Sequence, residues 1–330
     1  MLIVEITLAI FGLILLSAGG YVLVAGGAAL AKRLQISSMV VGLTVVAYGT
    51  STPELAASLT AVFNSHTDLI LGNIVGSNIS NIGMVIGISA MIATGLVIDG
   101  KKRNGLGMRR RVVTRWLPIM IFVSFLMLLL SFDGEISQID GAILVAGLIV
   151  FTIYIVKTAK KQIPVGDVIE DEDPSGDMAI SRFKVNTTPR AIFAVVVGAV
   201  LLFMGGDLTV DGAVNVAEDL GISELVIGVV IVAIGTSLPE LITSVIAIRK
   251  KQMDIGIGNI VGSNIYNILL IGGISATLIG IPVSTDVFSN YYIMIAFSLV
   301  LFIGFRKFIP RFVGIGLAMA FVAYLVSLLV

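Results

Sequence analysis

The sequence predicts an all-α integral membrane protein with ten transmembrane helices, arranged as two inverted five-helix repeats whose second and seventh helices are broken. Three observations support this prediction. Hydrophobic residues make up 57% of the chain and charged residues only 13%, whereas a soluble domain has about 25% charged residues. Ten apolar stretches are long enough to cross a bilayer. Finally, a pair of polar motifs occurs twice in the chain.

The apolar stretches, of roughly 17–25 residues, mark the expected helices. They lie near 2–30, 37–62, 69–97, 113–131, 138–157, 189–216, 222–248, 255–280, 288–305 and 310–329. Because five helices are an odd number, the second set of five enters the membrane from the opposite side. We therefore expect a first inverted repeat at 1–160, a cytoplasmic linker loop at 161–188 and a second inverted repeat at 189–330. The first and sixth stretches are long enough to be tilted.

The distribution of charge predicts the orientation. If the N-terminus is outside, the inner loops contain all 21 Lys and Arg residues. The positive-inside rule then places both termini outside and the 158–188 loop in the cytoplasm of a multi-pass cell-membrane protein. That loop contains the acidic run 170–173, which fits either an ion-sensing loop or a solvated linker, and the neighbouring Pro and Gly favour the linker. The outer loops carry acids: Asp68, Asp133, Glu135, Glu218, Asp219, Glu224 and Asp286.

Residue types that are rare or missing exclude several classes of site. The chain has no cysteine and a single histidine, His66, which excludes disulfides, thiolate metal sites, multi-histidine sites and histidine-based triads. No nucleophile–base pair is visible, so we do not expect an enzyme, although a pair of glutamates could imitate a carboxylate dyad. We expect no cofactor, no nucleic acid and no obligatory protein partner; membrane lipid is the expected surrounding.

The duplicated motifs place equivalent residues 186 positions apart. GLTVVAYGTSTPE at 42–54 corresponds to GVVIVAIGTSLPE at 228–240, and LGNIVGSNISNIG at 71–83 corresponds to IGNIVGSNIYNIL at 257–269. Between 34–89 and 220–275, 29 of 56 positions are identical. The most similar part of the repeat is also its most polar part, and it lies inside long apolar segments. This combination indicates a functional site within the membrane.

Two equivalent glutamates, Glu54 and Glu240, lie in the middle of predicted membrane helices. Ionisable groups at that depth normally face a cavity or the interior of the bundle. A buried carboxylate held by a structural partner is the alternative, but no Lys or Arg lies near that depth to pair with either one. A bound cation is the simplest remaining partner.

The residues around each glutamate predict a break in the helix. Pro53 and Pro239 have no N–H, so the carbonyls of Gly49 and Gly235 lose their helical donors. Broken backbone at membrane depth is tolerated where it lines a cavity, and the freed carbonyls can coordinate ions. Hydroxyl oxygens in the same two regions come from Thr50, Ser51, Thr236 and Ser237.

The second motif of each half predicts a polar stripe on one helix face. Its members are spaced four residues apart, as Asn73, Ser77 and Asn81 in the first half and Asn259, Ser263 and Asn267 in the second. The stripe fits either hydrogen bonds between helices or an ion site. We expect a partly structural role for the two leading asparagines and a place at the site for the other four residues. Glycines spaced four apart, at 72 and 76 and at 258 and 262, allow close helix packing.

The expected ligands are all oxygens: two carboxylates with hydroxyl, amide and backbone oxygens. Such a set suits a hard cation such as Ca²⁺, which takes about 6–8 oxygens. Na⁺ is similarly hard and of similar size, whereas Mg²⁺ demands a tighter octahedral geometry and retains its water. Two carboxylates neutralise one divalent ion or partly balance several monovalent ions. Competition between those two occupancies is what an exchanger requires.

At these residues the chain resembles the cation/calcium exchanger superfamily, specifically its prokaryotic sodium/calcium exchanger branch. The G-T-S-x-P-E and G-N-x-x-G-S-N-x-x-N motifs match the two alpha repeats of that family. The resemblance implies alternating access, with the first and sixth helices sliding across a bundle of the other eight. It also implies a calcium site of Glu54 and Glu240 with the carbonyls of Thr50 and Thr236. The implied flanking sodium sites are formed by Ala47, Ser51 and Ser77 with Ala233, Ser237 and Ser263.

One position departs from the family pattern. Relatives often have an aspartate where this chain has Asn267, the equivalent of Asn81, so this site has two formal negative charges instead of three. The departure leaves the occupancy of the middle position and the participation of potassium open. The G-N-x-x-E motif of the proton/calcium branch is missing, which argues against proton coupling. Asp207 and Asp211 have no acidic counterparts in the first half, and they suit either a helix-end role or ion entry near the outer surface.

The sequence therefore predicts a secondary-active antiporter that exchanges Na⁺ for Ca²⁺ by alternating access at a midplane site. A proton-coupled or potassium-involving exchanger of calcium or another divalent cation is the alternative within transport. A cation channel is the alternative from another class, but broken helices with inverted symmetry fit alternating access better.

Overall fold

The computed structural model describes residues 2–64, 67–94, 96–98, 101–159, 187–220 and 233–329. Of the predicted linker loop at 161–188, only the last two residues are described, so that prediction lies largely outside these ranges. His66 and Glu224 also lie outside them.

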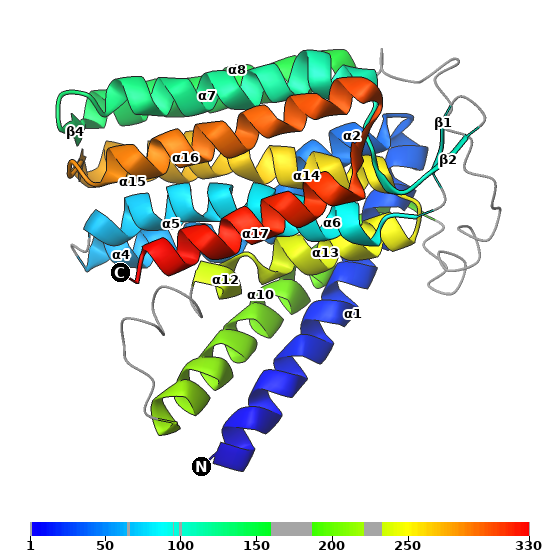
Figure 1. The fold of residues 1–330 in the computed structure, drawn as a ribbon, viewed down its shortest axis with the longest axis horizontal. Coiled ribbons are helices and arrows are strands. Elements are labelled where there is room, and N and C mark those ends of the chain that lie inside the picture. Colours follow the sequence, from blue (N-terminus) through cyan, green and yellow to red (C-terminus); the bar gives the residue numbers. More distant parts are fainter. Residues whose placement is uncertain are drawn as a thin grey trace.

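The described chain is almost entirely helical (Figure 1). Its first half contains α1 (Leu2–Leu34), α2 (Ser38–Val41), the π-helical η1 (Gly42–Val46), α3 (Ala47–Thr50), α4 (Thr52–Phe63), α5 (Thr67–Ser80), the π-helical η2 (Asn81–Ile86), α6 (Gly87–Ile92), the π-helical η3 (Val112–Trp116), α7 (Leu117–Leu130) and α8 (Gln138–Ala159). Its second half contains α10 (Thr188–Asp219), α12 (Ala233–Thr236), α13 (Leu238–Arg249), α14 (Met253–Tyr266), the π-helical η6 (Asn267–Gly272), α15 (Gly273–Ile279), α16 (Val287–Val300), the 3₁₀-helical η7 (Leu301–Arg306) and α17 (Arg311–Ser327).

Within the described ranges, seven helices are long and apolar enough to cross a membrane, compared with ten predicted spans. The difference has local causes. The predicted spans at 37–62 and 222–248 are interrupted at Ser51 and Ser237, and 221–232 lies outside the described residues. The last predicted span is shorter than expected, because α17 has 17 residues.

The two central helices of the bundle carry the second motif of each half. In the 18-residue apolar stretch of each span, the buried share is 94% for Met253–Ile279 and 78% for Leu69–Ile92, but only 39% for Ile3–Leu34 and 28% for Thr188–Asp219. Polar side chains on the central segments are therefore shielded from lipid by the surrounding helices.

Helices α1 and α10 form a closely packed pair that is inclined to the rest of the bundle (Figure 1). Their contact is a seam of glycines at seven-residue spacing. A Cβ atom added at Gly19 would lie 2.8 Å from the backbone nitrogen of Leu202, and one added at Gly205 would lie 2.6 Å from that of Leu16. The seam consists of Gly12, Gly19 and Gly26 on α1 and of their repeat equivalents Gly198, Gly205 and Gly212 on α10.

Short antiparallel strands tie the two halves together at opposite ends of the bundle. At one end β3 (Gly105–Gly107) pairs with β6 (Phe308–Pro310); at the other β4 (Glu135–Ile136) pairs with β5 (Ile281–Pro282). Near the first pair, β1 (Leu96–Ile98) and β2 (Lys101–Arg103) form a hairpin.

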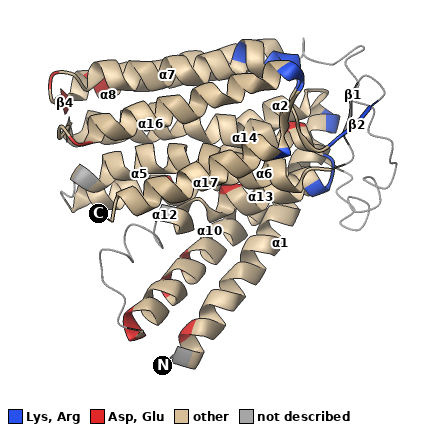
Figure 2. Cartoon of the chain, in the orientation of Figure 1, with Lys and Arg blue, Asp and Glu red and all other residues tan. Residues whose placement is uncertain are grey.

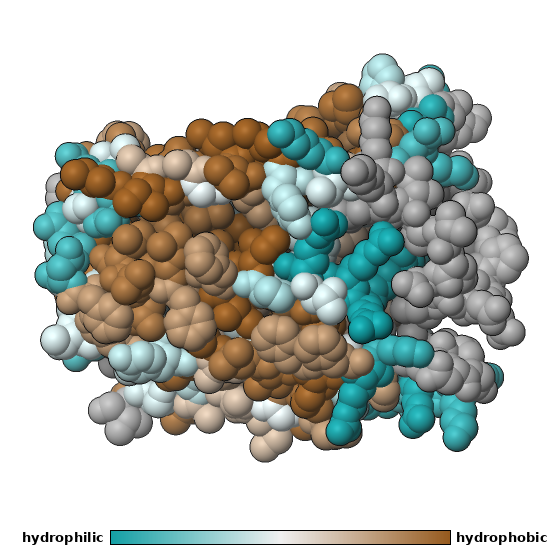
Figure 3. Space-filling view, turned by 90° about the horizontal axis from the view of Figure 1, so that it is seen from above, coloured by the Kyte–Doolittle hydropathy of each residue, from teal (hydrophilic) through white to brown (hydrophobic). Residues whose placement is uncertain are grey.

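Charge is segregated along the molecule. Lys and Arg gather at the end that carries β2, whereas most Asp and Glu lie away from it, at the end that carries β4 and along α10, and both termini also lie away from the basic end (Figure 2). On the face shown in Figure 3, a mostly apolar surface lies between hydrophilic residues toward both ends. This arrangement is typical of a membrane-spanning protein.

Candidate ion-binding site

The site begins at two equivalent interruptions of helical backbone. Ser51 (φ −85°, ψ 11°) separates α3 from α4, and Ser237 (φ −88°, ψ 2°) separates α12 from α13. In each case a proline follows at the start of the next helix and a glutamate lies in its first turn. The proline cannot donate to the preceding turn, so the break follows from the sequence as predicted.

Glu240 is bound by hydroxyls from both halves of the chain. Its Oε1 atom accepts a hydrogen bond from Ser51 Oγ at 3.1 Å and another from Ser263 Oγ at 3.3 Å. Glu240, Ser51 and Ser263 are at most 3% exposed. The second-half carboxylate is therefore completed by the first-half break, 189 residues away in sequence.

A second contact between the two halves of the chain lies beside the first. Thr50 Oγ1 donates to Asn259 Oδ1 at 2.9 Å and lies 3.4 Å from Ser263 Oγ. Asn259 Nδ2 in turn donates to Ser244 Oγ at 3.2 Å. Asn259 therefore positions Thr50 against α14, in agreement with its expected structural role.

Glu54 is buried without a hydrogen bond to its carboxylate. The side chain is 1% exposed, and neither Oε atom has a partner among the described residues. Its carboxyl group lies near that of Glu240. The Glu54 backbone carbonyl accepts a hydrogen bond from Asn73 Nδ2 at 2.9 Å. The same nitrogen also donates to Ser58 Oγ at 2.8 Å.

Four asparagines link the two central helices. Asn81 Nδ2 donates to Asn264 Oδ1 at 3.3 Å, and its repeat equivalent, Asn267 Nδ2, donates to Asn78 Oδ1 at 3.1 Å. Among the described residues, the Oδ1 atoms of Asn81 and Asn267 have no hydrogen-bond partner. Sequence reasoning missed the bridging pair Asn78 and Asn264, although both are duplicated within the second motif.

Close packing brings these groups together. A Cβ atom added at Gly262 would lie 2.7 Å from Ala47 Cβ and 2.8 Å from the carbonyl oxygen of Leu43. One added at Gly258 would lie 2.8 Å from the carbonyl oxygen of Met39. The predicted close approach is therefore present in the second half. At Gly72 and Gly76 no described atom lies within 4 Å of such a Cβ, and the repeat equivalents of Met39 and Leu43, at 225 and 229, lie outside the described residues.

Buried oxygens without partners are concentrated here. Among the described side chains they include both oxygens of Glu54, Glu240 Oε2, Asn81 Oδ1, Asn267 Oδ1 and Ser237 Oγ. A buried polar group without a partner costs about 1–3 kcal/mol, and a charged group costs more. No cluster of three or more His, Cys, Asp or Glu is found in the described ranges. A cation held here would therefore combine two carboxylates with hydroxyl, amide and backbone oxygens.

The structure places the predicted site residues as follows. Glu54, Glu240, Thr50, Ser51, Ser77, Ser237, Ser263, Asn81, Asn267 and Ala47 are buried, and Thr236 is half-buried. Ala233 is the first residue of α12, and its side chain lies outside the described part. Ser77 Oγ contacts Asn73 Oδ1 at 3.4 Å. Asp207 and Asp211 lie one turn apart on α10, and both are exposed.

Sequence reasoning also missed the π-helical segments. Two of them begin at equivalent residues, Asn81 and Asn267, and a third, at Gly42–Val46, directly precedes α3. π-Helical turns are rare and occur frequently at functional sites.

Comparison with known proteins gives consistent results. The family model for sodium/calcium exchanger protein matches residues 4–157 and 190–330. The putative antiporter CaxA of Alkalimonas amylolytica is 34% identical over 324 residues, which cover 95% of each chain. The sodium/calcium exchanger MaX1 of Methanosarcina acetivorans is 32% identical over 369 residues, covering 99% of each chain.

A solved structure is also similar over nearly the whole chain. The sodium-calcium exchanger NCX_Mj, soaked with Na⁺ and Ca²⁺, superposes with a TM-score of 0.79 at 28% identity, covering 99% of both chains. The likeness thus includes both broken helices and the two central helices that carry the polar motifs.

Proposed function

The chain belongs to the family of sodium/calcium exchanger proteins, and we propose that it is a secondary-active antiporter exchanging Na⁺ for Ca²⁺ by alternating access at a midplane site. The observation that supports this most strongly is the buried pair Glu54 and Glu240, three of whose four carboxylate oxygens have no hydrogen-bond partner among the described residues. Two carboxylates in an all-oxygen surrounding suit one Ca²⁺.

We propose positions for the ions from the family resemblance. Ca²⁺ would be bound by both glutamates with the backbone carbonyls of Thr50 and Thr236, which flank the helix breaks. One flanking Na⁺ position would use Ala47, Ser51 and Ser77, and the other Ala233, Ser237 and Ser263. The unpaired Oδ1 atoms of Asn81 and Asn267 would complete the middle position as neutral ligands.

A difference between the two half-sites supports alternating access. Ser51 donates to Glu240, whereas the equivalent Ser237 hydroxyl has no partner among the described residues and Glu54 accepts no hydrogen bond on its carboxylate. The asparagine bonds, by contrast, are formed equivalently on both sides. A rigid centre with two half-sites in different hydrogen-bonded states is what a site opened alternately from two sides requires.

The moving part would be the α1–α10 pair. Its glycine seam makes it one unit, and it is less buried than the central helices. We propose that it slides against the other helices of two inverted five-helix repeats, at 1–160 and 189–330, that are joined by a cytoplasmic loop. The segregation of Lys and Arg to one end supports placing both termini outside (Figure 2).

The proposal is tested by ⁴⁵Ca²⁺ uptake into vesicles containing the purified protein, with Na⁺, K⁺ and H⁺ gradients imposed separately. Uptake should follow the Na⁺ gradient, and Glu54→Gln and Glu240→Gln should each abolish it without loss of folded protein. Glu218→Gln is the matched control, because Glu218 is exposed near the end of α10. Uptake that does not respond to the Na⁺ gradient but follows the H⁺ or K⁺ gradient would show proton or potassium coupling instead of sodium coupling. Ca²⁺ flux that persists without any counter-ion gradient would instead indicate a channel.

A further inference from the structure

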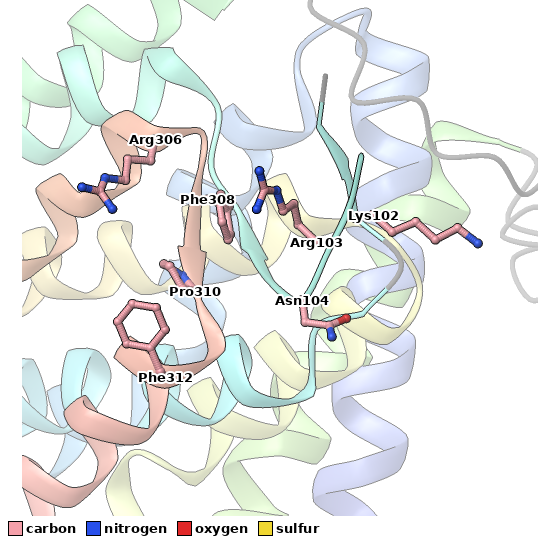
Figure 4. Close-up of a pocket in the computed structure, with 7 residues that line it drawn as sticks. All are labelled: Lys102, Arg103, Asn104, Arg306, Phe308, Pro310 and Phe312. Carbon is pink, nitrogen blue, oxygen red and sulfur yellow. The ribbon is translucent and has the colours of Figure 1, made fainter. Parts of the chain in front are cut away.

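A cavity at the basic end of the molecule is built from both halves of the chain. Its volume is about 630 Å³, and its walls come from the β2–β3 segment and from the connection between η7 and α17. It lies away from Glu54 and Glu240 and shares no residue with the ion site. Its lining residues are Lys102, Arg103, Asn104, Arg306, Phe308, Pro310 and Phe312 (Figure 4).

The walls are held in a fixed register by the β3–β6 pair. Leu106 pairs with Ile309, and both are fully buried. Gly105 has φ +152°, and a Cβ atom there would overlap the carbonyl oxygen of Ile309. Backbone bonds extend the pairing at both ends, from Met108 N to the Lys307 carbonyl at 2.8 Å and from Arg311 N to the Asn104 carbonyl at 3.3 Å. The two walls therefore form one rigid frame.

The cavity is cationic. Arg103 lies over the ring of Phe308, with its Cζ atom 5.9 Å from the ring centroid. Lys102 and Arg306 extend on the two flanks (Figure 4). None of these three cations forms an ion pair with an acid in the described part of the chain. Unpaired cations on a rigid frame favour an anionic ligand.

The position of the cavity identifies the source of that anion. Arg306 ends an apolar helix of spanning length, and α17 begins immediately after Pro310. Phe312, which lines the cavity, is 71% exposed. Cationic groups at the end of spanning helices, beside an exposed aromatic ring, lie at the depth of lipid headgroups.

We propose that this cavity binds the phosphate of an anionic phospholipid headgroup on the cytoplasmic side of the membrane. Arg103 is directed to the phosphate by its stacking on Phe308, Arg306 and Lys102 provide flanking charge, and Phe312 contacts the acyl region. The frame joins the connections before α7 and before α17, so lipid bound there bridges the two halves of the chain. The proposal is independent of which ions the midplane site carries.

The test is native mass spectrometry of the full-length protein, titrated with phosphatidylglycerol or with phosphatidylcholine of the same acyl chains. Phosphatidylglycerol should bind and phosphatidylcholine should not. Each cation near an anionic phosphate contributes about fivefold in affinity, so the double variant Arg103→Gln/Arg306→Gln should bind phosphatidylglycerol roughly 25- to 30-fold more weakly. The matched control is Arg110→Gln/Arg249→Gln, which removes two exposed arginines outside the cavity and should leave binding unchanged.

Further measurements distinguish binding of the lipid from binding of a free anion, and a loss of binding from misfolding of the variant. Inorganic phosphate and glycerol phosphate at millimolar concentration should not displace the lipid; displacement by either would show that the cavity takes a soluble anion and would overturn the proposal. If the double variant does not fold, Lys102→Glu replaces it, since this side chain is exposed and the reversed charge should weaken binding at least fivefold. Equal binding of both lipids, or unchanged binding in both variants, would also overturn it.

Discussion

The contact between α14 and α3 gives a direct test of how packing sets the geometry of the ion site. Gly262 faces Ala47 and Leu43, and a Cβ atom at this position would lie 2.7 to 3.0 Å from three of their atoms, whereas ordinary contacts begin near 3.4 Å. The substitution Gly262→Ala therefore requires a separation of about 0.7 Å, since two of the three facing atoms belong to backbone.

This separation is enough to break the cross-half hydrogen bonds. Two hydrogen bonds join these segments, Ser51 to Glu240 at 3.1 Å and Thr50 to Asn259 at 2.9 Å. If donor and acceptor move apart by the same amount, both distances reach about 3.6 Å or more, which is too long for a hydrogen bond. A hydrogen bond to a charged group contributes about 1.5–3 kcal/mol. We therefore expect the Ca²⁺ concentration for half-maximal uptake to rise about 10- to 100-fold in Gly262→Ala.

The assay is ⁴⁵Ca²⁺ uptake at varied Ca²⁺ under a fixed Na⁺ gradient, together with thermal unfolding in detergent. Overpacking costs about 1–3 kcal/mol, and the better helix propensity of Ala offsets about 1 kcal/mol of it, so a small loss of stability is expected. Gly316→Ala on α17 is the matched control, because no described atom lies within 4 Å of its Cβ position. Wild-type half-saturation in Gly262→Ala would refute the claim that this contact positions the ligands.

Three further predictions concern other parts of the chain. Gly198→Val should slow exchange far more than it weakens Ca²⁺ binding, because its Cβ would lie 2.6 Å from Leu23 N in the α1–α10 seam; equal losses in both assays would contradict this. Asn267→Asp should alter the selectivity among Na⁺, K⁺ and Ca²⁺ or the pH dependence of uptake, because it adds a third buried carboxyl group to the polar motifs; no change in either would place this residue off the ion path. Burial lowers the pKa of Lys250, just after α13, from 10.5 to about 8, so the folded chain releases this proton before the unfolded chain does. Wild type should therefore gain stability relative to Lys250→Met as pH rises from about 8 to 10.5, and a difference that stays flat over this range would exclude the effect.

The local chemistry of the site could be predicted from sequence because it depends on residues that are adjacent in the chain. A proline directly before each glutamate predicts a break at that point, and the structure breaks the helix at Ser51 and Ser237. These features depend on one segment at a time.

Contacts between segments could not be predicted in the same way. The repeat suggests that each glutamate is served by its own half, yet the Glu240 carboxylate accepts from Ser51 of the other half. The amide nitrogens of Asn81 and Asn267 likewise donate to the opposite half, to Asn264 and Asn78. Such pairings depend on the angle at which central helices cross, which periodicity does not specify.

The glycine seam was available in the sequence but was not recognised. Glycines at seven-residue spacing occur at equivalent positions in both long helices, and the constant spacing would have predicted a close α1–α10 contact. The π-helical turns are different, because nothing in the composition of Asn81–Ile86 distinguishes them from an α-helix.

Direct Ca²⁺ binding tests the central claim most closely. Equilibrium binding of ⁴⁵Ca²⁺ to the purified protein, measured with and without Na⁺, separates the site from the transport cycle. We expect saturable binding that Na⁺ displaces and that is lost in both Glu54→Gln and Glu240→Gln, with Glu218→Gln unchanged. Binding that survives in both glutamate variants, or that Na⁺ does not displace, would contradict the central claim.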